Sequence, residues 1–129
     1  MKKLFVVAGI AVISCCSAKK TTTDGDNNNR DSLSSISNNA PACIKKLILQ
    51  FQQEEKQNPA RSVYSYTYNG KPVFFVPAIC CDFFSDLYDN KCNLIAHPDG
   101  GFTGRGDGKA PDFMQTRAHE KLIWKDERK

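Results

Sequence analysis

Cysteine is the residue type in this chain with the widest chemical range, and the sequence contains six of them. Two end an apolar run near the N-terminus. The other four are Cys43, Cys80, Cys81 and Cys92. A zinc site would need ligand pairs spaced as Cys-x-x-Cys, which these four do not form. A nucleophilic thiol would need a positioned base, and the chain has only two histidines, His97 and His119. We therefore expect structural cysteines.

The second candidate site is the glycine-rich segment 97–109, which holds five of the eight glycines of the chain. Such a density indicates a backbone that adopts positive φ repeatedly or approaches another group closely. A phosphate cradle would end in Gly-Lys-Ser/Thr, but Ala110 follows Lys109. We favour a compact structural loop whose polar side chains bond its own amides. The candidate site residues in it are Asp99, Gly100, Gly101, Thr103, Arg105 and Asp107.

Two further interpretations of this segment are weaker. Calcium could be bound by Asp99, Asp107 and Asp112 with backbone carbonyls, but their spacing fits no EF-hand loop. Residues 105–107 spell Arg-Gly-Asp, the tripeptide that integrins recognise, although a three-residue match has little specificity.

The N-terminus predicts an export signal. Lys2 and Lys3 precede ten apolar residues, 4–13, which are too few to span about 30 Å of hydrocarbon as a helix. Residues 12–15, Val-Ile-Ser-Cys, resemble the lipobox of bacterial lipoproteins. The resemblance implies a signal peptide over residues 1–15 with diacylglycerol and palmitate-type acyl chains on Cys15. An ordinary secretory signal, or lipid on Cys16 instead, is the alternative.

Residues 16–40 predict a flexible tether, because only Leu33 and Ile36 among them are large and apolar. The residues directly after Cys15 carry no acidic cluster of the kind that directs some lipoproteins to the cell exterior. We therefore expect a lipid-anchored protein of the bacterial cell envelope on the periplasmic face of the outer membrane, with the cell surface as the alternative. Its membrane contact would be made through the N-terminal lipid.

Outside the cytoplasm thiols oxidise, so the four later cysteines are expected to form disulfide bonds. A bond between the neighbours Cys80 and Cys81 would strain the peptide that joins them, so we do not expect it. The two remaining pairings are 43–80 with 81–92, and 43–81 with 80–92. Successive residues of a strand point to opposite faces, so in either pairing one cysteine can tie the helix to the sheet while its neighbour ties the next loop.

Residues 41–129 predict one small α+β domain. The apolar spacing favours an amphipathic helix over 43–57, and Asn69-Gly70 is a strong hairpin turn between strands at 62–68 and 71–80. Further strands are expected at 92–97 and 120–125, with a short helix over 113–119. The predicted architecture is one N-terminal helix packed on an antiparallel sheet of three or four strands and stapled by disulfides.

The hairpin register would pair Tyr66 with Val73 and sort the side chains into two apolar faces. One face would carry Val63, Phe74, Val76 and Cys80. The other would carry Tyr64, Tyr66, Tyr68, Val73 and Phe75. One helix covers only one face, so the tyrosine face is a candidate binding surface, or a structural one.

Segments 43–46, 66–74, 80–82, 87–95 and 98–113 resemble an uncharacterised family of small, cysteine-rich lipoproteins of Gram-negative bacteria, a domain of unknown function. The resemblance implies location and a shared fold but no activity. Members of that family have cysteines at the positions of Ala96 and Ala110, which implies a bridge closing the glycine-rich loop. This chain lacks both, so a looser loop is expected.

The net charge of +4 includes no basic run longer than two residues, which argues against nucleic acid as a partner. Neither Gly-x-Ser-x-Gly nor His-Glu-x-x-His occurs. We expect a non-enzymatic binding or structural module without a cofactor, whose partner is an envelope protein or a small ligand. The alternative is a protease-inhibitor-like module. The third is a metal-dependent enzyme or calcium-binding domain that uses Asp99, Asp107 and His97.

Overall fold

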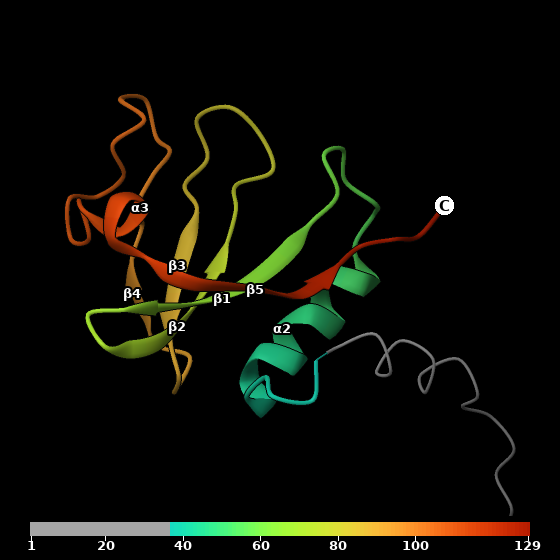
Figure 1. Ribbon diagram of the computed structural model, residues 1–129. Helices are drawn as coiled ribbons and strands as arrows, with labels where there is room; N and C mark the ends of the chain where they lie inside the picture. Colours follow the sequence, from blue (N-terminus) through green and yellow to red (C-terminus); the bar gives the residue numbers. More distant parts are fainter. Residues whose placement is uncertain (1–36) are drawn as a thin grey trace, which may run out of the picture.

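The computed structural model describes residues 37–129, so the predicted signal peptide, Cys15 and most of the predicted tether lie outside the described residues. The elements are α2 (Ala42–Gln53), β1 (Ser62–Tyr68), β2 (Lys71–Val76), β3 (Asp86–Asp89), β4 (Leu94–Ala96), α3 (Phe113–Thr116) and β5 (Ala118–Lys125) (Figure 1). The strands form one antiparallel sheet in the order β4-β3-β2-β1-β5. The α+β class is confirmed, but the sheet has five strands instead of the expected three or four.

The predicted hairpin is confirmed in its register. Tyr66 pairs with Val73 and Tyr68 with Lys71, and the turn residues Asn69 and Gly70 have φ values of 49° and 72°. β2 ends at Val76 and does not reach Cys80, because Pro77 follows and proline has no N–H to donate to a ladder. The chain therefore leaves the sheet before the adjacent cysteines.

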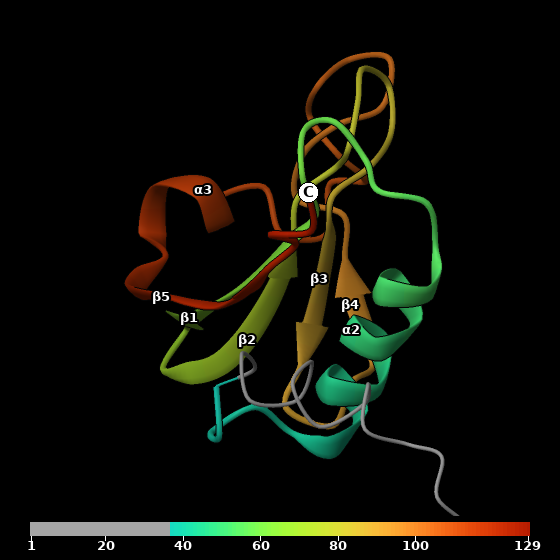
Figure 2. The ribbon, with the colours of Figure 1, turned by 90° about the vertical axis from the view of Figure 1, so that its right-hand side faces the viewer.

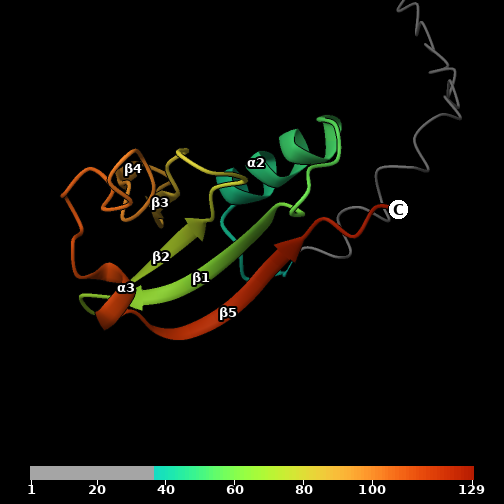
Figure 3. The same ribbon diagram turned by 90° about the horizontal axis from the view of Figure 1, so that it is seen from above.

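Helix α2 covers one face of the sheet. It is shorter than the predicted helix over 43–57, since Glu54 is already extended. Its buried side chains Ile44, Ile48 and Phe51 pack in one cluster with residues of β1, β2 and β5, among them Trp124. Figure 3 shows α2 lying along that face. The cluster includes Ala40, so the end of the range expected to be a tether is already part of the core.

The tyrosine face of the hairpin is largely covered and forms a second core. Helix α3 lies on the opposite side of the strands from α2 (Figure 2), and its Phe113 is fully buried against this face. Tyr66 is only 6% exposed, whereas Tyr64 and Tyr68 are partly buried. The remaining members of this cluster are Val73, Phe75, Leu87, Ala96 and Ala110.

Four cysteines form two disulfides, as expected, but neither predicted pairing is correct. Cys43 pairs with Cys92, and Cys80 pairs with its neighbour Cys81. The error follows from the early end of β2, because Cys80 and Cys81 lie in an exposed turn and not on opposite faces of a strand.

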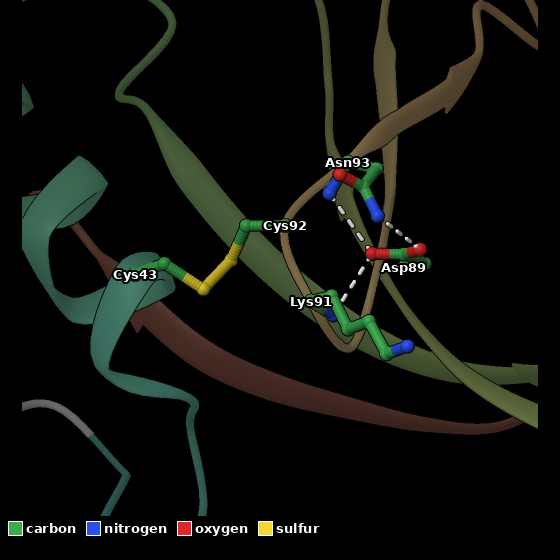
Figure 4. The surroundings of a disulfide bond; sticks show 5 residues. All are labelled: Cys43, Asp89, Lys91, Cys92 and Asn93. Carbon is green, nitrogen blue, oxygen red and sulfur yellow. Dashed lines mark hydrogen bonds between the residues drawn. A yellow bond between two sulfur atoms is a disulfide. The ribbon is translucent and has the colours of Figure 1, made fainter.

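The turn between β3 and β4 brings Cys92 to α2 (Figure 4). The carboxylate of Asp89 accepts hydrogen bonds from the backbone N–H groups of Lys91 and Asn93 at 2.8 and 2.9 Å, and from the Asn93 side-chain amide at 2.9 Å. Cys92 adopts a φ of 62° within this turn. The local hydrogen bonds of Asp89 therefore position the sulfur that fastens the helix to the sheet.

Candidate binding groove

A groove of about 900 Å³ lies on the tyrosine face of the sheet, opposite α2. Tyr64, Tyr66 and Phe75 contribute to its floor, and Met114 and Arg117 lie along the side formed by α3. The turn that follows β2 forms another wall. Small-molecule sites have volumes of about 300–1,000 Å³ and are lined by apolar and aromatic groups with a few placed polar ones. The groove has that size and composition.

Arg117 lies over the aromatic floor. Its guanidinium carbon is 4.8 Å from the centroid of the Tyr66 ring, 5.6 Å from Phe113 and 5.8 Å from Phe75. Its Nη1 also contacts the sulfur of Met114 at 3.2 Å. Cations are attracted to the faces of aromatic rings, so the three rings hold the guanidinium in place.

Tyr66 fixes a second charged group of the groove. Its hydroxyl donates to Glu120 Oε2 at 2.6 Å. Burial, with this hydrogen bond as a second cause, raises the pKa of Tyr66 to about 12, although Arg117 acts in the opposite direction. The phenol therefore stays protonated at neutral pH and remains a donor to the carboxylate. Tyr66 thus lies between a cation and an anion that both line the groove.

Arg117 differs from two other arginines of the domain, which are both paired with acids. Arg61 pairs with Glu54 at 2.8 Å, and Arg128 pairs with Asp126 at 2.6 Å. Within residues 37–129 no carboxylate forms an ion pair with Arg117. Its guanidinium is consequently available to an acidic group from outside the domain.

The wall formed by the turn after β2 carries the Cys80–Cys81 disulfide and Phe83, whose exposed fraction is 63%. The N–H of Phe83 donates to the carbonyl of Cys80 at 3.1 Å, which closes the turn. The buried hydroxyl of Ser85 accepts from the N–H of Ala78 at 2.9 Å and holds the two ends of the wall together. The backbone that carries this exposed aromatic ring is thus held in a closed turn at the groove.

The glycine-rich loop packs against this wall. Gly100 lies so close to the carbonyl of Phe83 that a Cβ would overlap it, and Gly101 lies against the ring of Phe84. A parallel bridge links Gly100 with Arg105. These glycines therefore allow the backbone to approach neighbouring groups closely and to adopt positive φ, as the sequence indicated.

The predicted loop residues are not brought together as one site. Only Asp99 and Gly100 line the groove. Thr103 accepts from the N–H of Arg105 at 3.4 Å. Asp107 accepts from the N–H of Lys109 at 3.0 Å, which holds the pKa of its carboxyl below its usual value. These side chains bond their own loop, as a structural loop requires.

A metal interpretation finds no support in the described range. No group of three or more His, Cys, Asp or Glu side chains that could hold a metal ion occurs among residues 37–129. Asp112, expected to join Asp99 and Asp107 at calcium, instead accepts from the hydroxyl of Tyr68 at 2.7 Å. The calcium ligand set is therefore divided among different local partners.

His97 is held in a structural pair. Its Nδ1 lies 2.9 Å from Asp86 Oδ1 and 3.2 Å from the carbonyl of Ser85, and its ring lies 5.1 Å from that of Phe84. A carboxylate orients a catalytic histidine in a similar way, but a nucleophile is also needed. Every cysteine in the described region is bonded to another cysteine, so none supplies a thiolate.

Sequence reasoning identified the tyrosines of the groove but not Arg117 or Glu120. Both belong to the segment around β5, which contributes to the groove because β5 returns to pair with β1. The spacing of Arg117 and Glu120 carried no motif that could have singled them out.

In the described part of the chain, no helix combines the length and apolar character needed to cross a membrane.

Comparison with known proteins gives one family. The family model described as Domain of unknown function (DUF6970) matches residues 49–126, which include all five strands, α3 and the lining of the groove. The comparisons with curated proteins and with solved structures gave no match. The match covers more than half of the chain, so this protein belongs to the DUF6970 family, a domain of unknown function.

Proposed function

We propose that this protein is a non-enzymatic binding module, anchored to the bacterial cell envelope by lipid on Cys15, and that its ligand occupies the groove on the tyrosine face. The observation that carries the binding role is the groove itself. It combines aromatic side chains, a guanidinium that has no ion pair among residues 37–129 and a hydrogen-bonded carboxylate in about 900 Å³. Concave sites of this composition are typical of small-ligand binding.

The proposed anchor depends on the lipobox-like residues 12–15 and is tested separately. Cells that express the protein are labelled with palmitate, and Cys15→Ser is compared with Cys16→Ser. We expect the label to disappear only from Cys15→Ser, because that cysteine follows the small residue Ser14. Equal labelling of both variants would remove the anchor from the proposal. Protease access in intact and opened cells then distinguishes the periplasmic face from the cell surface.

The binding role is tested with the full-length protein in detergent. Panels of short peptides, saccharides and small metabolites are screened by the shift they cause in the melting temperature. The hit is then measured against Tyr64→Ala, which alters the floor of the groove, and against Leu94→Ala as a matched control. Leu94 is an exposed apolar residue of β4 and does not line the groove.

The expected result is a hit whose affinity falls at least about tenfold in Tyr64→Ala, since a buried aromatic contact contributes more than about 1.4 kcal/mol. Leu94→Ala should leave the affinity unchanged. A ligand that binds both variants equally well lies elsewhere, and the groove would then lose its proposed role.

A protease inhibitor is the second candidate because Phe102 is 96% exposed in the glycine-rich loop. The loop suits this role less well than the groove suits ligand binding. The flanking glycines 100, 101 and 104 all have positive φ, whereas an inhibitor presents an extended segment to a protease. Loss of activity in a protease panel, reversed by Phe102→Ala, would favour the inhibitor.

A further inference from the structure

We infer that the groove takes a short peptide and that Arg117 binds the terminal carboxylate of that peptide. This inference rests on the proposed function, because it names the ligand class of the same groove. It depends on three features of the groove: the orientation of Arg117, the two carboxylates nearby and the exposed apolar side chains along the rim.

Arg117 is prepared for a carboxylate. A guanidinium is planar, and its N–H groups lie in that plane along its edge. Three aromatic rings lie within 6 Å of the guanidinium carbon, and the side chain is partly buried. An arginine fixed in this way loses little further entropy on binding and can donate two parallel hydrogen bonds to a carboxylate. No acid within residues 37–129 occupies that position.

The carboxylates of the groove require a ligand that also carries donors. Glu120 and Asp99 both line it, and Tyr66 holds Glu120 by one oxygen, Oε2. The other oxygen of Glu120 can accept from a ligand. A short peptide supplies amide N–H groups and, at the end opposite its carboxylate, an ammonium group. A fatty acid has no such donors and would place its chain against both acids, at a desolvation cost.

The rim favours apolar side chains on the ligand. Phe83 and Met114 line the groove and are exposed, and Ile79 and Pro77 line it as well. The apolar side chains of a short peptide would cover this surface, whereas an acidic saccharide would cover it with hydroxyl groups. The volume of about 900 Å³ suits a peptide of a few residues.

The test uses three probes with the full-length protein: the tripeptide Ala-Leu-Phe, its C-terminal amide and its N-acetylated form. Affinities are measured by calorimetry. We expect the amide to bind about 10- to 100-fold more weakly than the free acid, as a charge-assisted pair is lost. The N-acetylated form should bind more weakly as well, because it lacks the ammonium that Glu120 and Asp99 receive.

Arg117→Gln should remove the difference between acid and amide. Arg105→Gln is the matched control, because Arg105 is also an arginine without an ion pair among residues 37–129 but does not line the groove. It should keep the difference. Arg117→Lys retains the charge without the planar fork, so its preference for the acid should be intermediate. Circular dichroism of the three variants shows whether each is folded. A folded Arg117→Lys with an intermediate preference then separates a loss of recognition from a loss of folding.

Three results would overturn the inference. The first is that none of the three peptides binds. The second is that the acid binds no better than its amide. The third is a preference for the acid that survives in Arg117→Gln. A different outcome is a saccharide or another ligand whose affinity falls in Tyr64→Ala but not in Arg117→Gln. In that case the proposed function stands, and the assignment of a peptide as the ligand is wrong. If no hit from any class depends on Tyr64, the proposed function itself fails.

Discussion

Asp126 and Arg128 form a bidentate ion pair that closes the C-terminal end of helix α2. Nε of Arg128 lies 2.8 Å from Oδ1 of Asp126, and Nη2 lies 2.6 Å from Oδ2. The same guanidinium donates to the carbonyls of Gln52 and Glu54 at 2.7 and 3.0 Å. The last carbonyls of a helix have no partner within the helix, so a cation is favourable there. Arg128, which follows the last strand, thus stabilises the C-terminal end of α2, the first helix of the domain.

Replacing Arg128 with alanine should lower the free energy of unfolding, because a buried polar group that loses its partner costs about 1–3 kcal/mol. The Asp126 side chain is only 2% exposed, and the substitution leaves it without the guanidinium. Chemical denaturation of the variant and of Lys129→Ala, an exposed neighbour, measures the effect. Equal stabilities of the two variants would show that the pair contributes nothing.

The same pair predicts a dependence of stability on pH. Hydrogen bonds from Arg128 hold the pKa of Asp126 below its usual value of 3.8. The unfolded chain therefore takes up a proton at higher pH than the folded one. The stabilisation is complete above about pH 5 and is lost as the pH falls below about 4. The free energy of unfolding, measured by chemical denaturation from about pH 5 to well below about pH 4, should therefore fall less steeply with pH for Asp126→Asn than for the unmodified protein. The remaining slope would come from groups such as Asp89 and Asp107, whose pKa values are also lowered.

The two disulfides should contribute unequally to stability. Cys43 and Cys92 are 49 positions apart, whereas Cys80 and Cys81 are adjacent. A cross-link restricts the unfolded chain more when it closes a longer loop. Replacing the first pair with serines should cost about 2–4 kcal/mol, and replacing the second pair should cost distinctly less. Thermal or chemical unfolding measures both.

Peptide mapping without reductant supplies the control for that prediction. It should recover a fragment that joins the segments around Cys43 and Cys92. A fragment that joins Cys43 to Cys80 or Cys81 instead would contradict the connectivity described above.

Two glycines of the loop with the same φ offer a matched comparison. Gly104 and Gly106 both have φ of +68°, but a Cβ on Gly104 meets nothing, whereas one on Gly106 would overlap the carbonyl of His97. The strain of positive φ is common to both alanine variants. Gly106→Ala should therefore be less stable than Gly104→Ala by about 2 kcal/mol, the cost of overpacking. Equal unfolding free energies would mean that the loop is free to move away from His97.

Ala96 and Ala110 provide a test of the bridge implied by the family resemblance. Both are buried in the cluster around Phe113, so their side chains share one core. The double variant Ala96→Cys/Ala110→Cys should form a disulfide and raise the melting temperature by joining β4 to the end of the glycine-rich loop. Thiols that remain free in the folded variant, measured by alkylation, would refute the pairing.

Local sequence signals predicted the elements that depend on local chemistry. Asn69-Gly70 fixed the hairpin register, because both residues adopt positive φ readily. The apolar spacing around Ile48 predicted α2. Strand β3 was missed because Asp86–Asp89 has only four residues and an aspartate at each end. A strand of this kind is recognised by its pairing with β2, which lies outside any local window.

The candidate site could be predicted only in part for the same reason. Tyr64 and Tyr66 were identified through the hairpin register. Their environment could not be, since Arg117 and Glu120 reach them through the pairing of β5 with β1. The spacing of residues along the chain does not show that β5 pairs with β1.

The sequence by itself determined the α+β class, the hairpin register and the oxidation of the four later cysteines, because short-range periodicity, turn chemistry and residue type govern these features. The tertiary structure alone decided which cysteines pair, which face of the sheet α3 covers and which charged groups surround Tyr66. These features depend on contacts between segments far apart in the chain, whose energies appear only when the sheet has assembled.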